Sequence, residues 1–138
     1  MSYYAVIDTN VIVSALLTKN ENSPTLRVMR AVLSGEIIPL FHQDILEEYE
    51  EVLHRSKFHL EGETIERVIS AISYFGLEVS PVSTNEVLID PDDIIFYEVA
   101  MAKRDENAYL ITGNAKHYPV REFIVSPAEM MSLLCKKI

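Results

Sequence analysis

An apolar run that ends abruptly on an ionisable residue constrains this fold more than any other feature. Tyr3–Ile7 is followed by Asp8, and apolar residues then recur at helical spacing from Val11. A short run rich in β-branched and aromatic residues is typical of a strand buried on both faces of a parallel sheet. Such sheets carry their functional groups beyond the carboxyl ends of the strands, so Asp8 is a candidate functional residue. Considered alone, an Asp at this position is more often only the cap of the next helix.

Length and composition indicate one globular domain, residues 1–138, with 49% hydrophobic and 24% charged residues. Cys135 is the one cysteine in the sequence, which excludes an internal disulfide and a thiolate zinc cluster. This cysteine usage is typical of a reducing cytoplasm. The sequence shows neither a signal peptide nor an apolar run long enough to span a membrane, so we expect a cytoplasmic protein with no membrane partner.

The net charge of -9 comes from 21 acidic and 12 basic residues. It weighs against a protein that holds nucleic acid by bulk electrostatics, but not against a contact with phosphate that a metal ion bridges. Many of the acidic residues lie in two segments, Glu47–Glu51 and Asp90–Asp93. These two segments therefore need a structural or functional explanation.

Helices and strands alternate along the predicted chain. Apolar periodicity and capping signals predict helices over Val11–Leu17, Thr25–Ser34, Gln43–Arg55, Thr64–Phe75, from Asp93 onward, and over Met130–Cys135. Before the last of these, Ser126–Glu129 has the spacing of a capping box with Pro127 at the first helical position. Strands are predicted at Tyr3–Ile7, Ile37–Phe41, Leu77–Val82, Asn107–Thr112 and Phe123–Val125. Within the second strand, Pro39 indicates an edge or an irregular ladder. The alternation predicts an α/β fold of three layers, α/β/α, with a central, mostly parallel sheet of about five strands.

Two of the predicted strands end in a similar way, with polar residues directly after the apolar run. If these strands are parallel neighbours, Asp8 and Asn114 lie at the same edge of the sheet. Asp93 reaches that edge from the start of a helix. Glu48 lies between Ile45 and Val52 at the border of a helical apolar stripe, so it can reach the edge from the helix after the second strand.

Carboxylates gathered in one place repel one another and need a compensating cation. The candidate ligands are all oxygen atoms, which favours Mg2+ or Mn2+ over zinc. A hydrated Mg2+ held by carboxylates suits phosphate chemistry. No pair of histidines has a spacing typical of a zinc site, so we interpret each one as a surface or packing residue: His42, His54, His59 and His117.

Four motifs in the same order resemble those of the PIN-domain family, and most closely its prokaryotic branch of toxins from type II toxin-antitoxin systems. The motifs are Val6–Val11, Glu48–Leu53, Asp90–Asp93 with Phe96, and Thr112–Asn114 with Lys116–Pro119. The resemblance covers almost the whole chain. It implies a PIN fold and a metal-dependent endoribonuclease that uses one or two Mg2+ or Mn2+ ions and leaves a 5′-phosphate.

Matched residue by residue, the resemblance implies that Asp8, Glu48 and Asp93 are catalytic carboxylates and metal ligands. Asn114 falls at a fourth acidic position, where many relatives have Asp. An amide adds no charge, so this departure makes a second metal ion less certain. Whether Asp90 or Asp92 shares the task of Asp93 stays open, and one of the two is expected to cap the helix.

Other matching positions are polar residues that orient the ligands in the family, namely Thr9, Asn10 and Thr112. Among the basic residues, Lys116 directly follows the predicted active-site turn, so it is our candidate for contact with RNA. The remaining basic candidates are more often ordinary solvated charges: Arg27, Arg30, Lys103, Arg104 and Arg121. The resemblance also implies an antitoxin partner and frequent homodimers.

Two other interpretations compete with the nuclease. The first is a phosphatase of the haloacid dehalogenase type with Asp8 as nucleophile, but Asn10 stands where that chemistry normally requires a second acid. The second is a PIN fold that binds RNA or a protein without cleaving it. Both Asn114 and the acidic surface lend weight to this second interpretation.

Overall fold

The computed structural model describes residues 2–136, so residue 1 and residues 137–138 of the expected domain lie outside the described range. Its sheet has five strands in the order β3-β2-β1-β4-β5, and every neighbouring pair is parallel. The strands are β1 Tyr3–Ile7, β2 Ile37–Phe41, β3 Leu77–Glu78, β4 Tyr109–Ile111 and β5 Ile124–Val125. The predicted α/β class and the parallel sheet are confirmed.

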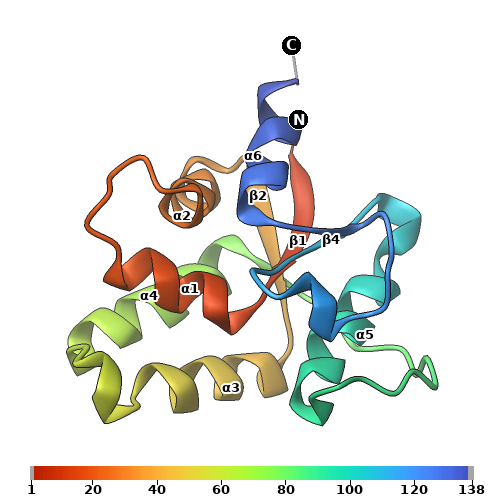
Figure 1. Ribbon diagram of the computed structural model, residues 1–138, viewed down its shortest axis with the longest axis horizontal. Coiled ribbons are helices and arrows are strands. Elements are labelled where there is room, and N and C mark those ends of the chain that lie inside the picture. Colours follow the sequence, from red (N-terminus) through yellow and green to blue (C-terminus); the bar gives the residue numbers. More distant parts are fainter. Residues whose placement is uncertain (1, 137–138) are drawn as a thin grey trace.

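Helices cover both faces of this sheet (Figure 1). They are α1 Thr9–Leu17, α2 Pro24–Ser34, α3 Gln43–Leu53, α4 Gly62–Phe75, α5 Ile94–Ala102 and α6 Pro127–Cys135. In Figure 1, α1, α2 and α4 lie to the left of the sheet and α5 lies to its right. Helix α5 packs on β1, β2 and β4, whereas α2 and α4 pack on β2. The structure therefore has the predicted three layers.

The central strands are buried on both faces, which is why their sequences are continuously apolar rather than alternating. Ala5, Val6 and Ile7 of β1 and Leu110 and Ile111 of β4 have no exposed surface. These two strands lie side by side with Ile7 opposite Ile111. The residues that directly follow them, Asp8 and Thr112, are therefore adjacent at the carboxyl edge of the sheet.

Helix α1 begins at Thr9, two residues earlier than predicted, because Asp8 itself is the N-cap and accepts a hydrogen bond from the backbone N–H of Asn10. Helix α6 begins at Pro127, the predicted first helical position. Both hydrogen bonds of the predicted capping box between Ser126 and Glu129 are present.

Most other differences from the predicted elements lie at their ends. Helix α3 ends at Leu53 rather than Arg55, and α4 begins at Gly62 rather than Thr64. A 3-10 turn, Pro91–Asp93, precedes α5, which begins at Ile94. The strand predicted over Leu77–Val82 is limited to Leu77–Glu78, and β4 and β5 are also shorter than predicted. Local periodicity does not fix where a ladder of hydrogen bonds stops, because that depends on the neighbouring strand.

The position of β2 decides between the two alternatives that Pro39 indicates, an edge strand or an irregular ladder. Strand β2 is not at an edge but lies between β1 and β3. The proline is tolerated because β3 pairs only with Leu40 and Phe41, so the ladder on that side begins after Pro39. The ladder is thus irregular, as the proline indicated, while the strand is internal.

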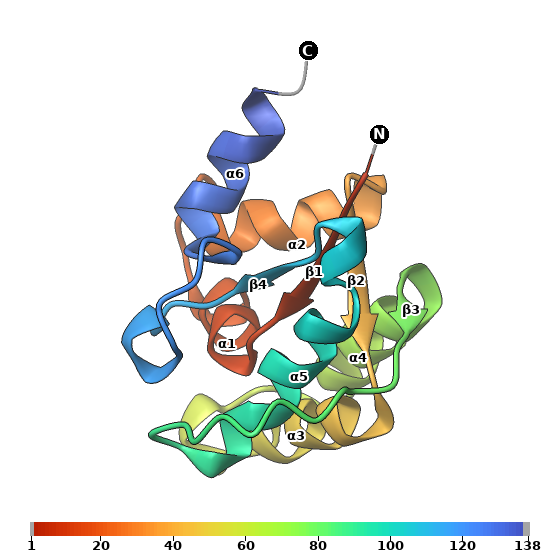
Figure 2. The ribbon, with the colours of Figure 1, turned by 90° about the vertical axis from the view of Figure 1, so that its right-hand side faces the viewer.

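Figure 2 shows the same arrangement from the side, with β3 beside β2 and α4, and α6 beside α2. Within residues 2–136, none of the helices combines the length and the apolar character that crossing a membrane requires.

Candidate functional site

A pocket of about 390 Å³ lies at the carboxyl edge of the sheet, and it is lined by all four predicted catalytic residues. Asp8 reaches it from the end of β1, Glu48 from α3, Asp93 from the turn before α5, and Asn114 from the segment after β4. Segments far apart in the sequence thus supply oxygen atoms to one pocket.

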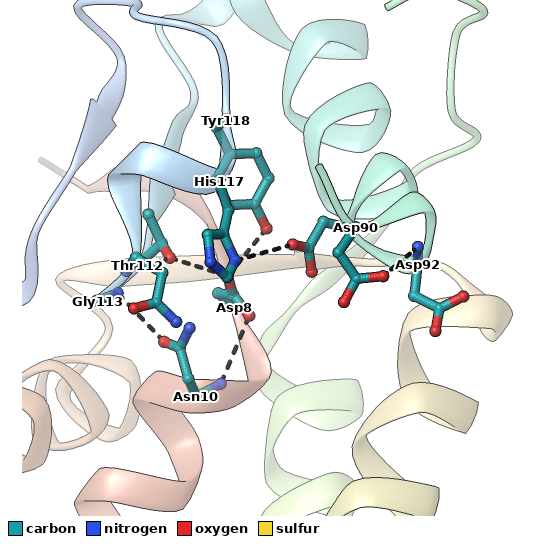
Figure 3. Close-up of polar contacts among 10 residues, drawn as sticks. Asp8, Asn10, Asp90, Asp92, Thr112, Gly113, His117 and Tyr118 are labelled. Carbon is teal, nitrogen blue, oxygen red and sulfur yellow. Dashed lines mark hydrogen bonds and ion pairs between the residues drawn. The ribbon is translucent and has the colours of Figure 1, made fainter. Parts of the chain in front are cut away.

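Asp8, which lines this pocket, is held by a set of hydrogen bonds (Figure 3). It is only 5% exposed. The hydroxyl groups of Thr112 and Tyr118 both donate to its Oδ2 atom, each at 2.9 Å. Within residues 2–136, its Oδ1 atom accepts a single long contact, 3.5 Å, from the backbone N–H of Asn10. The carboxylate is therefore fixed in orientation through one oxygen, while the other retains capacity to accept.

The same polar residues tie the ends of β1 and β4 together. The backbone N–H of Gly113 donates to Oδ1 of Asn10 at 3.2 Å, and that of Asn114 donates to Oγ1 of Thr112 at 3.0 Å. The Thr112 hydroxyl thus accepts one hydrogen bond and donates another to Asp8. Thr112 thus contacts Asp8 directly through its hydroxyl, whereas the Asn10 side chain contacts the backbone of Gly113.

Asp93 lies in an environment that disfavours its charge. Its side chain is 16% exposed, and the Nδ1 atom of His117 is 3.7 Å from its Oδ2. Burial, and then the charges of Asp8 and Asp90, raise the pKa of Asp93 to about 6. This carboxyl therefore titrates close to neutral pH.

Glu48 is half-buried in the same pocket. Burial is the main cause that raises its pKa, and the charges of Glu51 and Asp92 add to it. Its position on α3 agrees with the prediction that this glutamate, at the border of the apolar stripe, points inward.

The two neighbouring aspartates have different positions. Asp90 caps the 3-10 turn, since its side chain accepts from the backbone N–H of Asp92 at 3.0 Å, and it also lines the pocket. Asp92 is exposed (Figure 3). The N-cap of α5 itself is Asp93, without a side-chain capping hydrogen bond, so the expectation that Asp90 or Asp92 caps this helix is wrong, and Asp90 caps only the 3-10 turn before it.

The sequence predicts a surface or packing role for His117, but this residue lines the pocket beside Asp93. Tyr118 and Tyr49 were also missed. Burial, with Asp8 nearby, raises the pKa of both tyrosines, so each stays protonated and able to donate. Tyr118 donates to Asp8, and the hydroxyl of Tyr49 donates to the carbonyl of Ile7, the last residue of β1. The one available signal was that His117 and Tyr118 follow Asn114 closely in the fourth motif.

Lys116, the predicted contact for RNA, is exposed and lines a different pocket, with Tyr118 and Pro119 among its neighbours. The structure therefore brings the four carboxylate and amide residues together, but it does not bring Lys116 into their pocket.

The fit of this pocket to a divalent ion rests on its donor atoms. As they stand, the residues within 2–136 include no group of three or more histidine, cysteine, aspartate or glutamate side chains arranged to hold a metal ion. The pocket nevertheless offers oxygen donors from carboxylates and an amide, and the buried Thr9 hydroxyl, which also lines it, has no hydrogen-bond partner in the described part of the chain. Such donors suit a hydrated Mg2+ or Mn2+, which keeps several of its waters.

The raised pKa of Asp93 predicts how the stability of the protein without divalent ions depends on pH. Because its folded pKa of about 6 is above the ordinary 3.8, the fold favours the protonated carboxyl. This stabilisation is complete below the ordinary pKa and is lost as the pH rises through 6. In EDTA, the melting temperature of wild type should therefore fall relative to that of Asp93→Asn as the pH is raised from about 3.5 to about 7.5. A difference that does not change with pH would contradict the raised pKa.

The fold and the pocket define a class, α/β proteins with an acidic oxygen-donor site at the carboxyl edge of a parallel sheet. The model of the PIN domain family matches residues 4–116, so the chain belongs to the PIN domain family, as its motifs predicted. Members of this family are in general nucleases, hydrolases that act on nucleic acids and typically use divalent metal ions. Comparison with curated proteins gave no match.

Proposed function

We propose that this protein is a metal-dependent endoribonuclease that hydrolyses RNA phosphodiester bonds, and that it is the toxin of a toxin-antitoxin pair. The observation that carries the proposal is the pocket lined by Asp8, Glu48 and Asp93 in a chain of the PIN domain family. The toxin role is supported by the resemblance of the motifs to the prokaryotic toxin branch. The proposed setting is the cytoplasm.

In this proposal Asp8, Asp93 and Glu48 hold Mg2+ or Mn2+, and Asn114 supplies a neutral oxygen beside them. An ion held by these residues would supply charge neutralisation of the phosphate and a more acidic bound water. Thr112 and Tyr118 orient the Asp8 carboxylate through Oδ2. Thr9, Asn10 and Lys116 are proposed to assist, the first two beside Asp8 and the lysine by contact with RNA.

The test is cleavage of single-stranded and structured RNAs, labelled at one end, with Mg2+, Mn2+ or EDTA. We expect internal cleavage with either ion, products that carry a 5′-phosphate, and no cleavage in EDTA. A protein that is inert with every divalent ion tried would refute the nuclease function.

An antitoxin is proposed as a partner, and a homodimer as the assembly. A toxin should arrest growth when expressed alone, and growth that continues unchanged would contradict that role.

A second candidate function is an inactive PIN domain that binds RNA or a protein. The observation that favours it is Asn114, which lines the pocket where many relatives have a carboxylate. RNA binding without cleavage would support this second function. If Asn114→Asp restores or increases cleavage, the site is catalytic and the amide of Asn114 lowers its activity.

Binding of the ion should also change stability. We expect Mn2+ to raise the melting temperature of wild type more than that of Asp93→Asn, because an ion that binds only the folded state stabilises it, by about 2.7 kcal/mol at about 100 times its Kd. Thermal melts with and without Mn2+ at neutral pH check this expectation. Equal shifts in both proteins would argue against Asp93 as a ligand.

A further inference from the structure

A groove leads away from the acidic pocket between α2 and α6. Its first part is a pocket of about 430 Å³ that shares Asn10, Ser14 and Asn114 with the acidic pocket. Its second part, about 470 Å³, shares Pro24 and Ala128 with the first. We call these two parts together the α2–α6 groove. The helices on its two sides pack against each other in the view of Figure 2.

The charge of this groove differs from that of the protein. The sequence has 21 acidic residues and a net charge of -9, yet no carboxylate is among the residues that line either part of the groove within the described chain. Its first part is lined by the hydroxyl residues Ser14, Ser23, Thr25 and Ser126. Repulsion of an anion is therefore weaker along this path than in the acidic pocket.

Basic residues stand at the far end of the groove. Arg27 on α2 and Lys136 after α6 line its second part, and both are exposed. The groove thus begins at the carboxylates, continues past neutral hydroxyl groups and ends at two cations. An RNA strand carries one phosphate per nucleotide. The phosphate at the cleaved bond has to reach the metal ion at the carboxylates, and the phosphates further along the strand need neutral or basic groups to bind them.

We propose that the α2–α6 groove holds the single RNA strand on one side of the bond that is cleaved. The proposal rests on the proposed nuclease function, to which it adds the path of the substrate. Each part has a volume in the range of about 300–1,000 Å³ that suits small ligands, so it accommodates a nucleotide or two rather than a duplex. In the first part, the hydroxyl groups of Ser14, Thr25 and Ser23 hydrogen-bond one another, whereas that of Ser126 accepts from the backbone N–H of Glu129 and keeps its own hydrogen for a phosphate or sugar oxygen. Arg27 and Lys136 attract the more distant phosphates.

Ala128 offers the sharpest test, because it is exposed and lines both parts of the groove. Ala128→Glu places a negative charge in the middle of the path, and Ala128→Arg places a positive one there. In the first turn of α6 a glutamate favours the helix, so weaker RNA binding by Ala128→Glu cannot be assigned to unfolding. We expect the Kd for a fluorescent single-stranded RNA to rise about three- to tenfold in Ala128→Glu and to fall in Ala128→Arg.

Arg27→Glu should weaken binding in the same way and reduce the slope of log Kd against log salt by about 1. Its matched control is Arg67→Glu, which changes the net charge equally but lies on α4 and lines a different pocket. For a variant that cleaves RNA, the groove substitutions should raise KM and leave kcat within about twofold.

The outcomes separate the groove from the nuclease function. Opposite shifts of Kd in the two Ala128 variants, with an unchanged Kd in Arg67→Glu, support the groove whether or not the protein cleaves RNA. Absence of cleavage with every divalent ion would refute the nuclease function but not the groove. Equal Kd values for wild type and both Ala128 variants overturn the groove, whether or not the protein cleaves RNA. A loss of binding in Arg67→Glu as large as that in Arg27→Glu also overturns it, because net charge would then explain both.

Discussion

Replacing Asp8 by Asn is expected to reduce the rate of RNA cleavage by more than about 100-fold. Loss of a residue that only hydrogen-bonds to a metal ligand already costs up to about 100-fold, and Asp8 is proposed to be a ligand itself. Asp8 is the innermost carboxylate of the pocket, 5% exposed, and its Oδ2 accepts two hydrogen bonds. An amide keeps one oxygen as acceptor but removes the negative charge that a divalent ion requires. The measurement is single-turnover cleavage with Mg2+ and with Mn2+.

The matched control for this substitution is Asp92→Asn. This substitution also exchanges an aspartate for an asparagine, but the side chain of Asp92 is exposed. Only the backbone N–H of Asp92 takes part in the cap of the 3-10 turn, where it donates to the side chain of Asp90. We expect its cleavage rate to stay within about twofold of wild type, as for a surface substitution. Thermal melts of both variants check that they are folded. A folded Asp8→Asn protein that cleaves as fast as wild type would remove Asp8 from the proposed site.

Replacing Gly76 by Ala is expected to lower the free energy of unfolding by about 3 kcal/mol or more, at the upper end of the cost of overpacking. A Cβ atom at this position would lie 2.4 Å from the carbonyl oxygen of Ile72 and 2.4 Å from that of Pro39. Both are backbone atoms, one in the last turn of α4 and one in β2, so neither moves without shifting its element. Urea denaturation of wild type and variant measures the loss.

Gly62→Ala is the control for this second prediction. Gly62 is the first residue of α4, and a Cβ atom there would have no atom within 4 Å. Since alanine restricts the unfolded chain and favours a helix, this change should be neutral or stabilise the protein by about 0.4–1 kcal/mol. Equal free energies of unfolding for Gly76→Ala and Gly62→Ala would contradict the close approach of β2, β3 and α4 at Gly76.

Several features of the fold were open to prediction because they depend on neighbours in the sequence. The buried strand Tyr3–Ile7 and the polar residue at its end follow from a local run of apolar residues, and the structure has both. The capping box of Ser126 and Glu129 is also local, and both of its hydrogen bonds form. The parallel arrangement followed from the alternation of strands and helices.

The composition of the pocket was predictable only in part. Asp8, Glu48, Asp93 and Asn114 could be named because each stands at a marked position, after a strand, on the border of a stripe or before a helix. The signal for His117 is only its closeness to Asn114 in the fourth motif, and no spacing indicates its contact with Asp93. The orientation of Lys116 away from the pocket was equally hidden, since it is set by the 3-10 turn Ala115–His117.

The sequence by itself determined the class of fold, the run of elements and the acidic residues at the strand ends, because hydrophobic periodicity and capping act over a few residues. Only the tertiary structure decided that β2 is internal despite Pro39 and that Tyr118 holds Asp8. The hydrogen bond between Tyr118 and Asp8 joins positions 110 residues apart. A contact of that kind depends on the order and register of strands β1, β4 and β5, which are fixed only when the sheet assembles and its faces are buried.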